Sequence, residues 1–426
     1  MSKRAMQRGP EANVSDRRLP VRSFRRSLQG AEGLLCIALT LIVTPLCAQA
    51  QTASKPRARD LGVPFDGAPG PLNAITDVAG VEVGYTTLIS GEGKLVVGQG
   101  PIRTGVTAIL PRGKNSFEPV LSGFYAQNGN GEMTGTVWID EAGVLQGPIM
   151  ITNTHSVGLV RDAVIEWQRN KARQFSWLLP VVAETYDGGL NDINGFHVKK
   201  EHVFRALDSA RSGPVAEGNV GGGTGMNCNG WKGGSGTSSR RLAAAQGGFT
   251  VGVFVQCNAG GRNSARLGGV PIAEITQPVG CVTQRLEGVS ANTPVCPPDE
   301  TKSIIVVVAT DAPLMPNQLK RVARRVSLGL GRVGMTAGNG SGDIFVAFST
   351  ANEGFDSDPS GVATVKMVTN GRISALFEAT VQASEEAVAN AMVGAETMTG
   401  ANYRRAYAIP HDAVRNLMKK YNRAKP

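Results

Sequence analysis

Short apolar runs separated by glycine-rich turns make up most of the chain after residue 66. Continuous apolar runs of about four to eight residues are typical of strands that are covered on both faces. These runs predict strands at seven places: Val81–Tyr85, Gly105–Leu110, Ile149–Thr152, Trp177–Ala183, Thr250–Gln256, Ile304–Ala309 and Ile344–Phe348.

Other segments repeat their apolar residues at the three- and four-residue spacing of one helix face. This spacing predicts helices over Ser156–Arg169 and Asn317–Leu330, an amphipathic helix over Thr380–Ala395, and a terminal helix over Asp412–Tyr421. Strands that are buried on both faces need helices to cover them. We therefore predict an α/β fold built as a layered sandwich.

Two segments lack this patterning. Residues 51–66 are polar, and we expect them to form a flexible N-terminus. Gly213–Ser239 is dominated by Gly, Ser, Thr and Asn, but Lys232 precedes the glycines, so the order of a phosphate-binding loop is absent. Two interpretations of this segment stay open, a long surface loop or a backbone that passes close to a ligand.

Composition narrows the class of protein. The 426 residues include 54 glycines, 41% hydrophobic residues and 18% charged residues, which favours many tight turns in a folded chain over disorder. The net charge is +10, but residues 1–33 hold eight basic and three acidic residues and so supply half of it. No basic run with interleaved aromatic residues follows, so nucleic-acid binding is not indicated.

The first fifty residues have the pattern of an export signal. A basic region precedes the apolar run 34–43, and Ala48-Gln49-Ala50 fits the rule for cleavage after Ala50. Residues 1–50 are thus predicted to be a signal peptide, and the mature protein is predicted to be periplasmic or secreted, without a membrane segment. The alternative is a membrane anchor, for which the apolar run is short.

Four cysteines remain after the predicted leader. In an oxidising compartment Cys281 and Cys296, which flank a short segment, are a candidate disulfide. Cys257 lies in an apolar strand and is interpreted as a buried thiol. No spacing of cysteine or histidine typical of a metal site occurs, so we expect no metal.

Ser303 stands at the head of an apolar strand, directly after a polar stretch. Exposed loop tips of that kind are where chains are cut. If the Lys302–Ser303 bond were cut, Ser303 would gain an α-amine, which titrates near pH ~8 and can act as the base for its own hydroxyl. The alternative interpretation is an ordinary boundary between loop and strand.

Ser341 and Asp343 lie in a glycine-rich turn, Gly338–Asp343, ahead of a predicted strand. Residues two apart in an extended chain point to the same side, so the pair could hold a nucleophile or orient one. A plain hairpin turn is the alternative. The turn resembles a Gly-x-Ser-x-Gly elbow only loosely, because no helix follows it.

Two further strands end in polar residues. Glu184 is a candidate to hold a substrate ammonium, and Tyr186 and Asn258 are candidate donors to an oxyanion. Solvated strand ends and turn formation are the alternatives. The four histidines are scattered without a triad-like neighbour, which favours a serine whose base is its own α-amine.

Several stretches together resemble the DmpA/BapA family of L-aminopeptidase/D-esterases and β-peptidyl aminopeptidases. They occur in order through nearly all of the predicted mature chain. These stretches are Asn128–Gly135, Ala183–Gly188, Gly218–Met226, Val255–Asn258, Ser303–Leu314, Gly338–Asp343 and Glu396–Gly400.

The resemblance implies a four-layer αββα sandwich, similar to N-terminal nucleophile hydrolases but with its own connectivity. It implies a precursor cut between Lys302 and Ser303 into an α chain, residues 51–302, and a β chain, residues 303–426. The family commonly has Gly or Asn before the cut, where this chain has Lys302. Residues 280–301, just before the cut, look like an elaboration.

The resemblance also implies residue roles. Ser303 matches the nucleophile, Ser341 and Asp343 the serine–acid pair, Tyr186 and Asn258 the oxyanion donors, and Glu184 the acid that receives the substrate's amino group. It implies small peptide, amide or ester substrates, no metal or organic cofactor, and a tetramer of αβ units. Substrate stereochemistry stays open.

Two rival hypotheses stay open at this point. One is a hydrolase that uses Ser341 as its nucleophile without self-cleavage. The other is a periplasmic peptide-binding protein without catalysis, which the unusual Lys302 keeps open.

Overall fold

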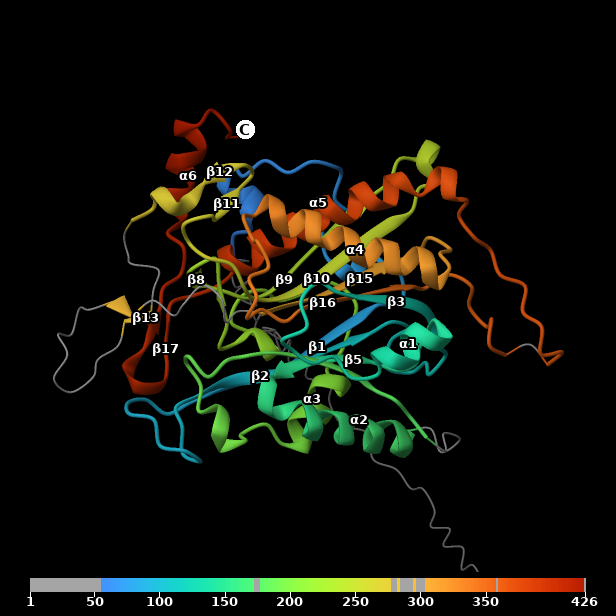
Figure 1. Ribbon diagram of the computed structural model, residues 1–426, viewed down its shortest axis with the longest axis horizontal. Coiled ribbons are helices and arrows are strands. Elements are labelled where there is room, and N and C mark those ends of the chain that lie inside the picture. Colours follow the sequence, from blue (N-terminus) through green and yellow to red (C-terminus); the bar gives the residue numbers. More distant parts are fainter. Residues whose placement is uncertain are drawn as a thin grey trace, which may run out of the picture. The chain divides into compact units, whose positions relative to one another are not determined.

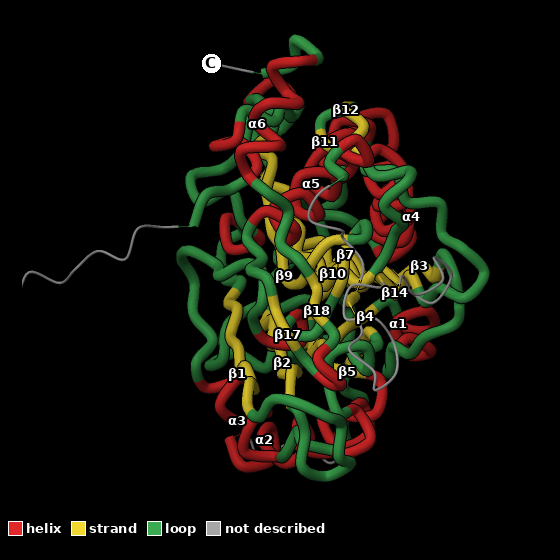
Figure 2. The backbone as a smooth tube through the Cα atoms, turned by 90° about the vertical axis from the view of Figure 1, so that its left-hand side faces the viewer, coloured by secondary structure: helices red, strands yellow, loops and turns green. Residues whose placement is uncertain are grey.

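Two β-sheets face each other, and a pair of helices covers the outer face of each, as Figures 1 and 2 show from two directions. This computed structural model describes residues 55–171, 177–276, 303–357 and 359–424, and the backbone of the short strands β13 (Val282–Thr283) and β14 (Pro294–Val295). The described residues belong to one compact unit. The layer order confirms the predicted αββα sandwich.

The first sheet has four strands in the order β1-β2-β5-β6. β5 and β6 run parallel and are joined through α2, whereas the other pairs are antiparallel. The helices α2 and α3 cover its outer face (Figure 1). The bounds are β1 Glu82–Ser90, β2 Ile102–Leu110, β5 Ile149–Asn153, β6 Val181–Thr185, α2 Val157–Lys171 and α3 Lys200–Asp208.

The second sheet has six strands in the order β4-β3-β16-β15-β10-β9. β15 and β16 run parallel and are joined through α4; the other pairs are antiparallel. The helices α4 and α5 cover its outer face. The bounds are β3 Val120–Ala126, β4 Val144–Leu145, β9 Gly234–Arg241, β10 Thr250–Asn258, β15 Ser303–Thr310, β16 Asp343–Ser349, α4 Pro316–Arg332 and α5 Ser374–Val393.

The side chains of β15 point alternately to the two faces of the sheet, and this explains why the strands are continuously apolar. Ile305 and Val307 pack between the two sheets, while Ile304 and Val306 pack against the helices. All four side chains are fully buried, because both faces of this sheet are covered. The side chain of Ser303 follows the same alternation and faces the space between the sheets.

Smaller elements decorate the sandwich. No helix among the described residues is both long and apolar enough to span a bilayer. These elements are α1 Thr136–Ala142, α6 His411–Lys420, β7 Asn227–Cys228, β8 Trp231–Lys232, β11 Arg266–Leu267, β12 Val270–Pro271, β17 Met398–Thr399 and β18 Arg405–Ala406.

All seven predicted strands and all four predicted helices are present, with shifted ends. The prediction for Trp177–Ala183 was wrong at its start: β6 begins at Val181, after Pro180, whose missing N–H cannot join a ladder. The amphipathic prediction for α5 was also wrong, because both charged and apolar side chains from Ala379 to Val393 are buried.

The surface-loop interpretation of Gly213–Ser239 was wrong. The end of this segment forms β9, whose residues from Gly234 to Arg240 are buried. A glycine is needed here because α5 lies so close: a Cβ added at Gly236 would fall 2.2 Å from the carbonyl oxygen of Ala387. The polar composition of this segment is therefore the reason that the buried strand β9 was not predicted from the sequence.

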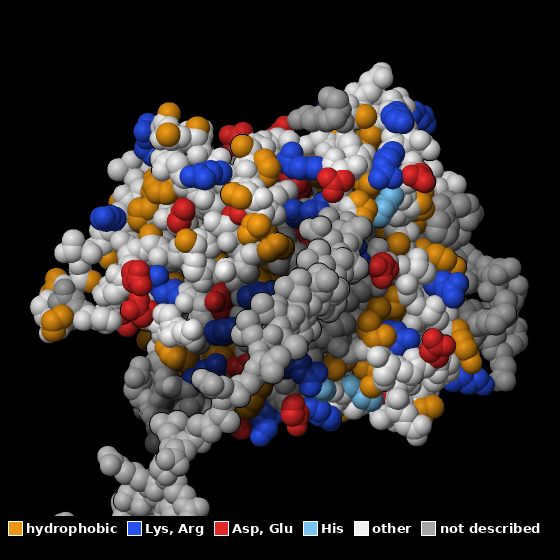
Figure 3. Space-filling model, turned by 180° about the vertical axis from the view of Figure 1, so that it is seen from behind, with side chains coloured by type: hydrophobic (Ala, Val, Ile, Leu, Met, Phe, Trp, Pro, Cys, Tyr) orange, Lys and Arg blue, Asp and Glu red, His pale blue; other side chains and the backbone are white. Residues whose placement is uncertain are grey.

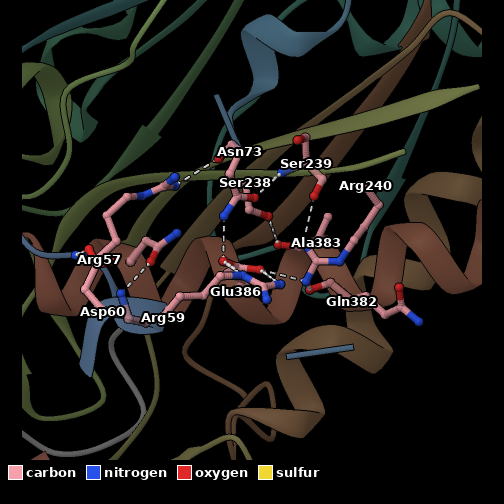
Figure 4. Close-up of polar contacts among 12 residues, drawn as sticks. Arg57, Arg59, Asp60, Asn73, Ser238, Ser239, Arg240, Gln382, Ala383 and Glu386 are labelled. Atoms are coloured by element: carbon pink, nitrogen blue, oxygen red, sulfur yellow. Dashed lines mark hydrogen bonds and ion pairs between the residues drawn. The ribbon is translucent and has the colours of Figure 1, made fainter. Parts of the chain in front are cut away.

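The expectation of a flexible N-terminus was wrong for the described part, residues 55–66. Ala58–Leu61 forms a 3₁₀ helix, and Ala58, Leu61 and Phe65 are buried. Arg59 and Arg240 converge on the buried carboxylate of Glu386 in α5 (Figure 4), at 2.7 and 2.8 Å. The N-terminal segment is thus bound to the C-terminal third of the chain.

Some predictions fall outside the described residues. They are the signal peptide 1–50, the residue Lys302 before the predicted cut, and the pair Cys281 and Cys296. These stay predictions.

Candidate functional site

Ser303 is the first residue of β15, and its neighbours on both sides are candidate site residues. In the register of the sheet, Asn258 of β10 lies opposite Ser303, and Asp343 of β16 lies opposite Ile304. Ser303 is 7% exposed, and its Oγ accepts a hydrogen bond of 3.0 Å from the Gly342 N–H. Three strands therefore bring the predicted nucleophile and its candidate partners together.

Ser341 and Asp343 form the predicted polar pair. The Ser341 hydroxyl donates to Asp343 Oδ1 at 2.5 Å, and the same oxygen accepts from the Ile304 N–H at 3.2 Å. Burial raises the pKa of Asp343, and these two hydrogen bonds offset part of that rise. The acid is thus anchored to the main chain of the residue that follows Ser303.

A second glycine-rich loop, Asn128–Gly131, packs against the turn that holds this pair. The Asn130 N–H donates to the Ser341 carbonyl at 3.3 Å, and the Asn128 amide donates to the carbonyls of Gly338 and of the residue before it. A Cβ at Gly342 would fall 2.4 Å from the Asn130 carbonyl oxygen. Only a residue without a side chain allows the two loops to approach this closely.

Glu184 stands at the end of β6 and is 3% exposed. It accepts hydrogen bonds from the Thr154 hydroxyl and, at 3.2 Å, from the Glu132 N–H. Burial raises its pKa, which these hydrogen bonds partly offset. A Cβ at Gly131 would lie 3.1 Å from both Glu184 Oε1 and the Gly342 Cα, so one glycine separates Glu184 from the Ser303 turn.

Asn258 and Tyr186 are brought together through the main chain of Tyr186. Asn258 Nδ2 donates to the Tyr186 carbonyl at 2.9 Å, and Asn258 Oδ1 accepts from the Asn227 N–H at 2.9 Å. The Tyr186 ring is half exposed, and its hydroxyl lies against Gly188. Asn258 is thus held firmly beside Ser303, whereas the phenol of Tyr186 lies at the surface.

A pocket of about 240 Å³ opens beside the Ser341–Asp343 pair. Its walls combine small and apolar residues with a few hydroxyl groups. The lining residues are Ala259, Gly260, Gly261, Ser264, Met335, Thr336, Ala337, Gly338, Ser341 and Asp343.

Sequence reasoning missed three groups near this site. The Gly342 N–H is a backbone donor, and a backbone donor cannot be identified as part of a site from the residue type. Asp187 is buried beside Tyr186, accepts from the Asn191 amide, and has its pKa raised by burial to about 7. Lys232 is fully buried and has its pKa lowered by burial to about 7. The position of Lys232 between Trp231 and a run of glycines was the sequence feature that could have indicated its burial.

The interpretation of Cys257 as a thiol was wrong. Cys257 forms a disulfide with Cys228, with a Cα–Cα distance of 5.5 Å, and joins the short strand β7 to the end of β10. The two cysteines are 29 residues apart in sequence, and only the fold brings them together.

The chain resembles known proteins over most of its length. A profile described as peptidase family S58 matches residues 73–406. The β-peptidyl aminopeptidase BapA of Sphingosinicella microcystinivorans is 55% identical over 387 residues, which cover 90% of this chain and 97% of that protein.

Two solved structures have the same fold. The L-aminopeptidase D-Ala-esterase/amidase from Ochrobactrum anthropi has a TM-score of 0.77 and 46% identity, over 87% of this chain and all of that one. It is described as a prototype for the serine aminopeptidases and a new variant among the Ntn hydrolase fold. A β-aminopeptidase from Burkholderia sp. has a TM-score of 0.75 and 46% identity, over 86% and 99% of the two chains.

Proposed function

Since this chain belongs to peptidase family S58 and is an aminopeptidase, we propose that Ser303 is its nucleophile and that it first cuts its own Lys302–Ser303 bond. The observation that carries the proposal is the place of Ser303. It heads the central strand β15, its hydroxyl is held by the Gly342 N–H, and an acid–serine pair is anchored on the next residue.

The first reaction is an acyl shift within the chain. Ser303 Oγ attacks the Lys302 carbonyl carbon, the Lys302–Ser303 C–N bond breaks, and the Ser303 nitrogen takes up the hydroxyl proton. Water then hydrolyses the resulting ester, which leaves a carboxylate on Lys302 and a free α-amine on Ser303. The Gly342 N–H, already on Ser303 Oγ, orients this hydroxyl before the attack.

In the mature enzyme the same hydroxyl attacks the substrate carbonyl. The new α-amine accepts the Oγ proton and passes it to the leaving amine, and water then releases the acyl group. Asn258, opposite Ser303 in the sheet, donates to the oxyanion, and Tyr186, half exposed beside the site, is the second proposed donor. Ser341 and Asp343 orient the α-amine from the neighbouring strand.

Glu184 selects substrates that have a free amino group. Among the described residues it forms hydrogen bonds with Thr154 and Glu132 but no ion pair with lysine or arginine. A buried carboxylate without a cationic partner is costly, and a substrate ammonium would relieve that cost. The activity is therefore directed to the N-terminal residue.

The proposed substrates are small peptides, amides or esters with an N-terminal L-, D- or β-amino acid. β-Amino acids are included because one similar protein is named a β-peptidyl aminopeptidase and another a β-aminopeptidase. The described side chains on the face in Figure 3 interleave acidic and basic groups, a pattern that does not favour a polyanionic substrate.

We also propose that the mature protein is periplasmic or secreted and assembles as a tetramer of αβ units. The leader pattern and the Cys228–Cys257 disulfide support an oxidising compartment. The number of αβ units rests on the family resemblance alone.

One observation keeps Ser341 as a second candidate nucleophile. Its hydroxyl lines the 240 Å³ pocket and donates to a buried carboxylate, whereas Ser303 is not among the lining residues.

Two alanine variants separate these candidates. Ser303→Ala removes the attacking oxygen of both reactions, so we expect an uncut chain without amidase activity toward an amino-acid p-nitroanilide. Ser341→Ala removes a supporting hydroxyl and should retain slow processing at the same bond. A processed, active Ser303→Ala variant, or an uncut wild-type chain with full activity, would contradict the proposal.

A further inference from the structure

The hairpin Asn227–Lys232, made of β7 and β8, lies beside the end of β10 (Figure 2) and meets Asn258 there. The Asn227 N–H donates to Asn258 Oδ1 at 2.9 Å. An amide side chain has a donor end and an acceptor end, and a neighbouring N–H must meet the acceptor. The hydrogen bond from the hairpin therefore orients the Asn258 amide. Its Nδ2, with two hydrogens, points toward Tyr186 and away from Asn227.

Two links hold the hairpin to β10 on either side of this hydrogen bond. The Cys228–Cys257 disulfide joins the residue after Asn227 to the residue before Asn258. The Asn229 N–H donates to the Ala259 carbonyl at 2.8 Å. These two links fix the position of the hairpin along the axis of β10.

Lys232 closes the base of the same hairpin. Its Nζ donates to the carbonyls of Met226 and Gly233, each at 2.7 Å, and these residues flank the hairpin in sequence. The Gly233 N–H also donates to the Met226 carbonyl at 2.9 Å. The amine and the Gly233 N–H together set the direction of the peptide between Met226 and Asn227, whose N–H reaches Asn258.

Stability alone does not explain this lysine. Its side chain is fully buried, and no carboxylate of the described chain pairs with its Nζ. Burial without a counter-ion disfavours the charged form of the amine and lowers its pKa to about 7, and an apolar side chain of similar length, such as methionine, would avoid this cost of burial. A methionine at this position would lack the two hydrogen bonds that Lys232 donates to carbonyls.

We propose that Lys232 is a positioning residue for acyl transfer, which holds the Asn227 N–H on Asn258 and so aims the Asn258 amide at the oxyanion. The inference rests on the proposed role of Asn258. Without the amine, only the Gly233 N–H still holds the Met226 carbonyl, so the Met226–Asn227 peptide is fixed less firmly. The Asn258 amide then loses its fixed acceptor contact, and its donor no longer meets the transition state at the right distance.

The test compares Lys232→Met and Asn258→Ala, singly and together, with Lys200→Met as the control. Lys200 is an exposed lysine of α3 that pairs with Glu166 at the surface. Turnover is counted per Ser303 N-terminus, measured by Edman sequencing, so that loss of folded or processed protein does not lower the number. Lys232→Met should lower kcat at least about tenfold with KM within about twofold, since small misplacements of catalytic groups reduce rate strongly.

The double variant should be no slower than the slower single variant, because both changes remove one function. A wild-type kcat for Lys232→Met beside an impaired Asn258→Ala would overturn this inference and leave the proposed function intact. A wild-type kcat for Asn258→Ala would overturn the role of Asn258 and the inference with it. If the methionine variant does not fold, Lys232→Gln, whose amide keeps two donor hydrogens, is measured instead and should retain more activity than Asn258→Ala; equal or lower activity would overturn the inference.

Discussion

Two buried glutamates show how single residues divide between structure and function. Glu386 is surrounded by Arg59, Arg240 and Asn73; burial alone would raise its pKa, but these partners outweigh burial and lower it. Glu184 is almost as buried, but the hydrogen bonds it receives within the described chain come from neutral donors, and its pKa is raised despite a favourable electrostatic contribution from His155. The first carboxylate is neutralised within the chain, and the second is suited to a cation from outside.

The pH dependence of Glu184 gives a test at this scale. Because burial raises its pKa, the ionised form that binds an ammonium appears only above the usual range of a glutamate, and kcat/KM should rise with pH through that region. Glu184→Gln should remove this limb and lower kcat/KM about 10- to 100-fold, the equivalent of one charge-assisted hydrogen bond. Steady-state kinetics across pH measure both effects.

The matched control is Glu201→Gln, an exposed carboxyl of α3 that should leave the profile unchanged. An unchanged acid limb in the Glu184 variant would contradict the assigned role.

At the residue scale, sequence motifs located Ser303, Ser341, Asp343 and Glu184, and the fold brings them together. The Gly342 N–H and Lys232 were not predicted from the sequence, because their roles depend on where backbone donors and carbonyls point. Tyr186 is beside the site, but the direction of its ring could not be deduced from its position in a motif.

At the scale of elements, apolar strands were predictable and β9 was not. Its hydroxyl side chains are buried, but each meets a partner: Thr237 donates to the Val253 carbonyl, Ser238 to the Ala383 carbonyl, and Ser239 to Asp77. Buried hydroxyls are tolerated when they are hydrogen-bonded. Such a strand lacks the apolar signature on which sequence-based prediction relies.

The contact between β9 and α5 can be tested with glycine variants. Gly236→Ala would place a methyl group 2.2 Å from the Ala387 carbonyl oxygen and 2.6 Å from the Ala391 nitrogen, both main-chain atoms. Overpacking of this kind typically costs about 1–3 kcal/mol. Thermal or urea unfolding should show a clear loss of stability.

Gly331→Ala in α4 is the control, because no atom outside its chain neighbours and the nearby backbone of its own helix lies within 4 Å of the added methyl group. Alanine favours a helix over glycine by about 0.5–1 kcal/mol, so this variant should be neutral or more stable. Equal stability of the two variants would show that β9 and α5 are not packed this closely.

At the scale of the whole molecule, the proposed cut turns one chain into two that must stay associated. β15 would belong to the β chain and still pair with β10 of the α chain, and β16 would pair with β3. Glu386, on the β-chain side, binds Arg59 and Arg240 on the α-chain side (Figure 4). The sheet and this ionic cluster therefore hold the products of cleavage together.

Glu386→Gln tests the contribution of the cluster. It would leave Arg240, which is 1% exposed, without its carboxylate, and removal of one partner from a buried ion pair typically costs about 3–5 kcal/mol. We expect a lower melting temperature and easier separation of the two chains in urea. Glu378→Gln, at an exposed position of the same helix, should change stability by less than about 0.5 kcal/mol.

The sign of the pH effect follows from the lowered pKa of Glu386. Its stabilisation is fully present above the pKa of an unfolded glutamate and is lost as pH falls through the lower, folded value. The difference in stability between wild type and Glu386→Gln should therefore shrink in acid. A difference that stays constant down to acid pH would contradict the ion-pair account.

The central claim is that Ser303 becomes a new N-terminus, and intact-mass analysis with N-terminal sequencing of the purified wild-type protein tests it most directly. The account predicts two chains, one that ends at Lys302 and one that begins at Ser303, with aminopeptidase activity in that processed form. A single uncut chain with full activity, or an active second chain that begins at another residue, would contradict it.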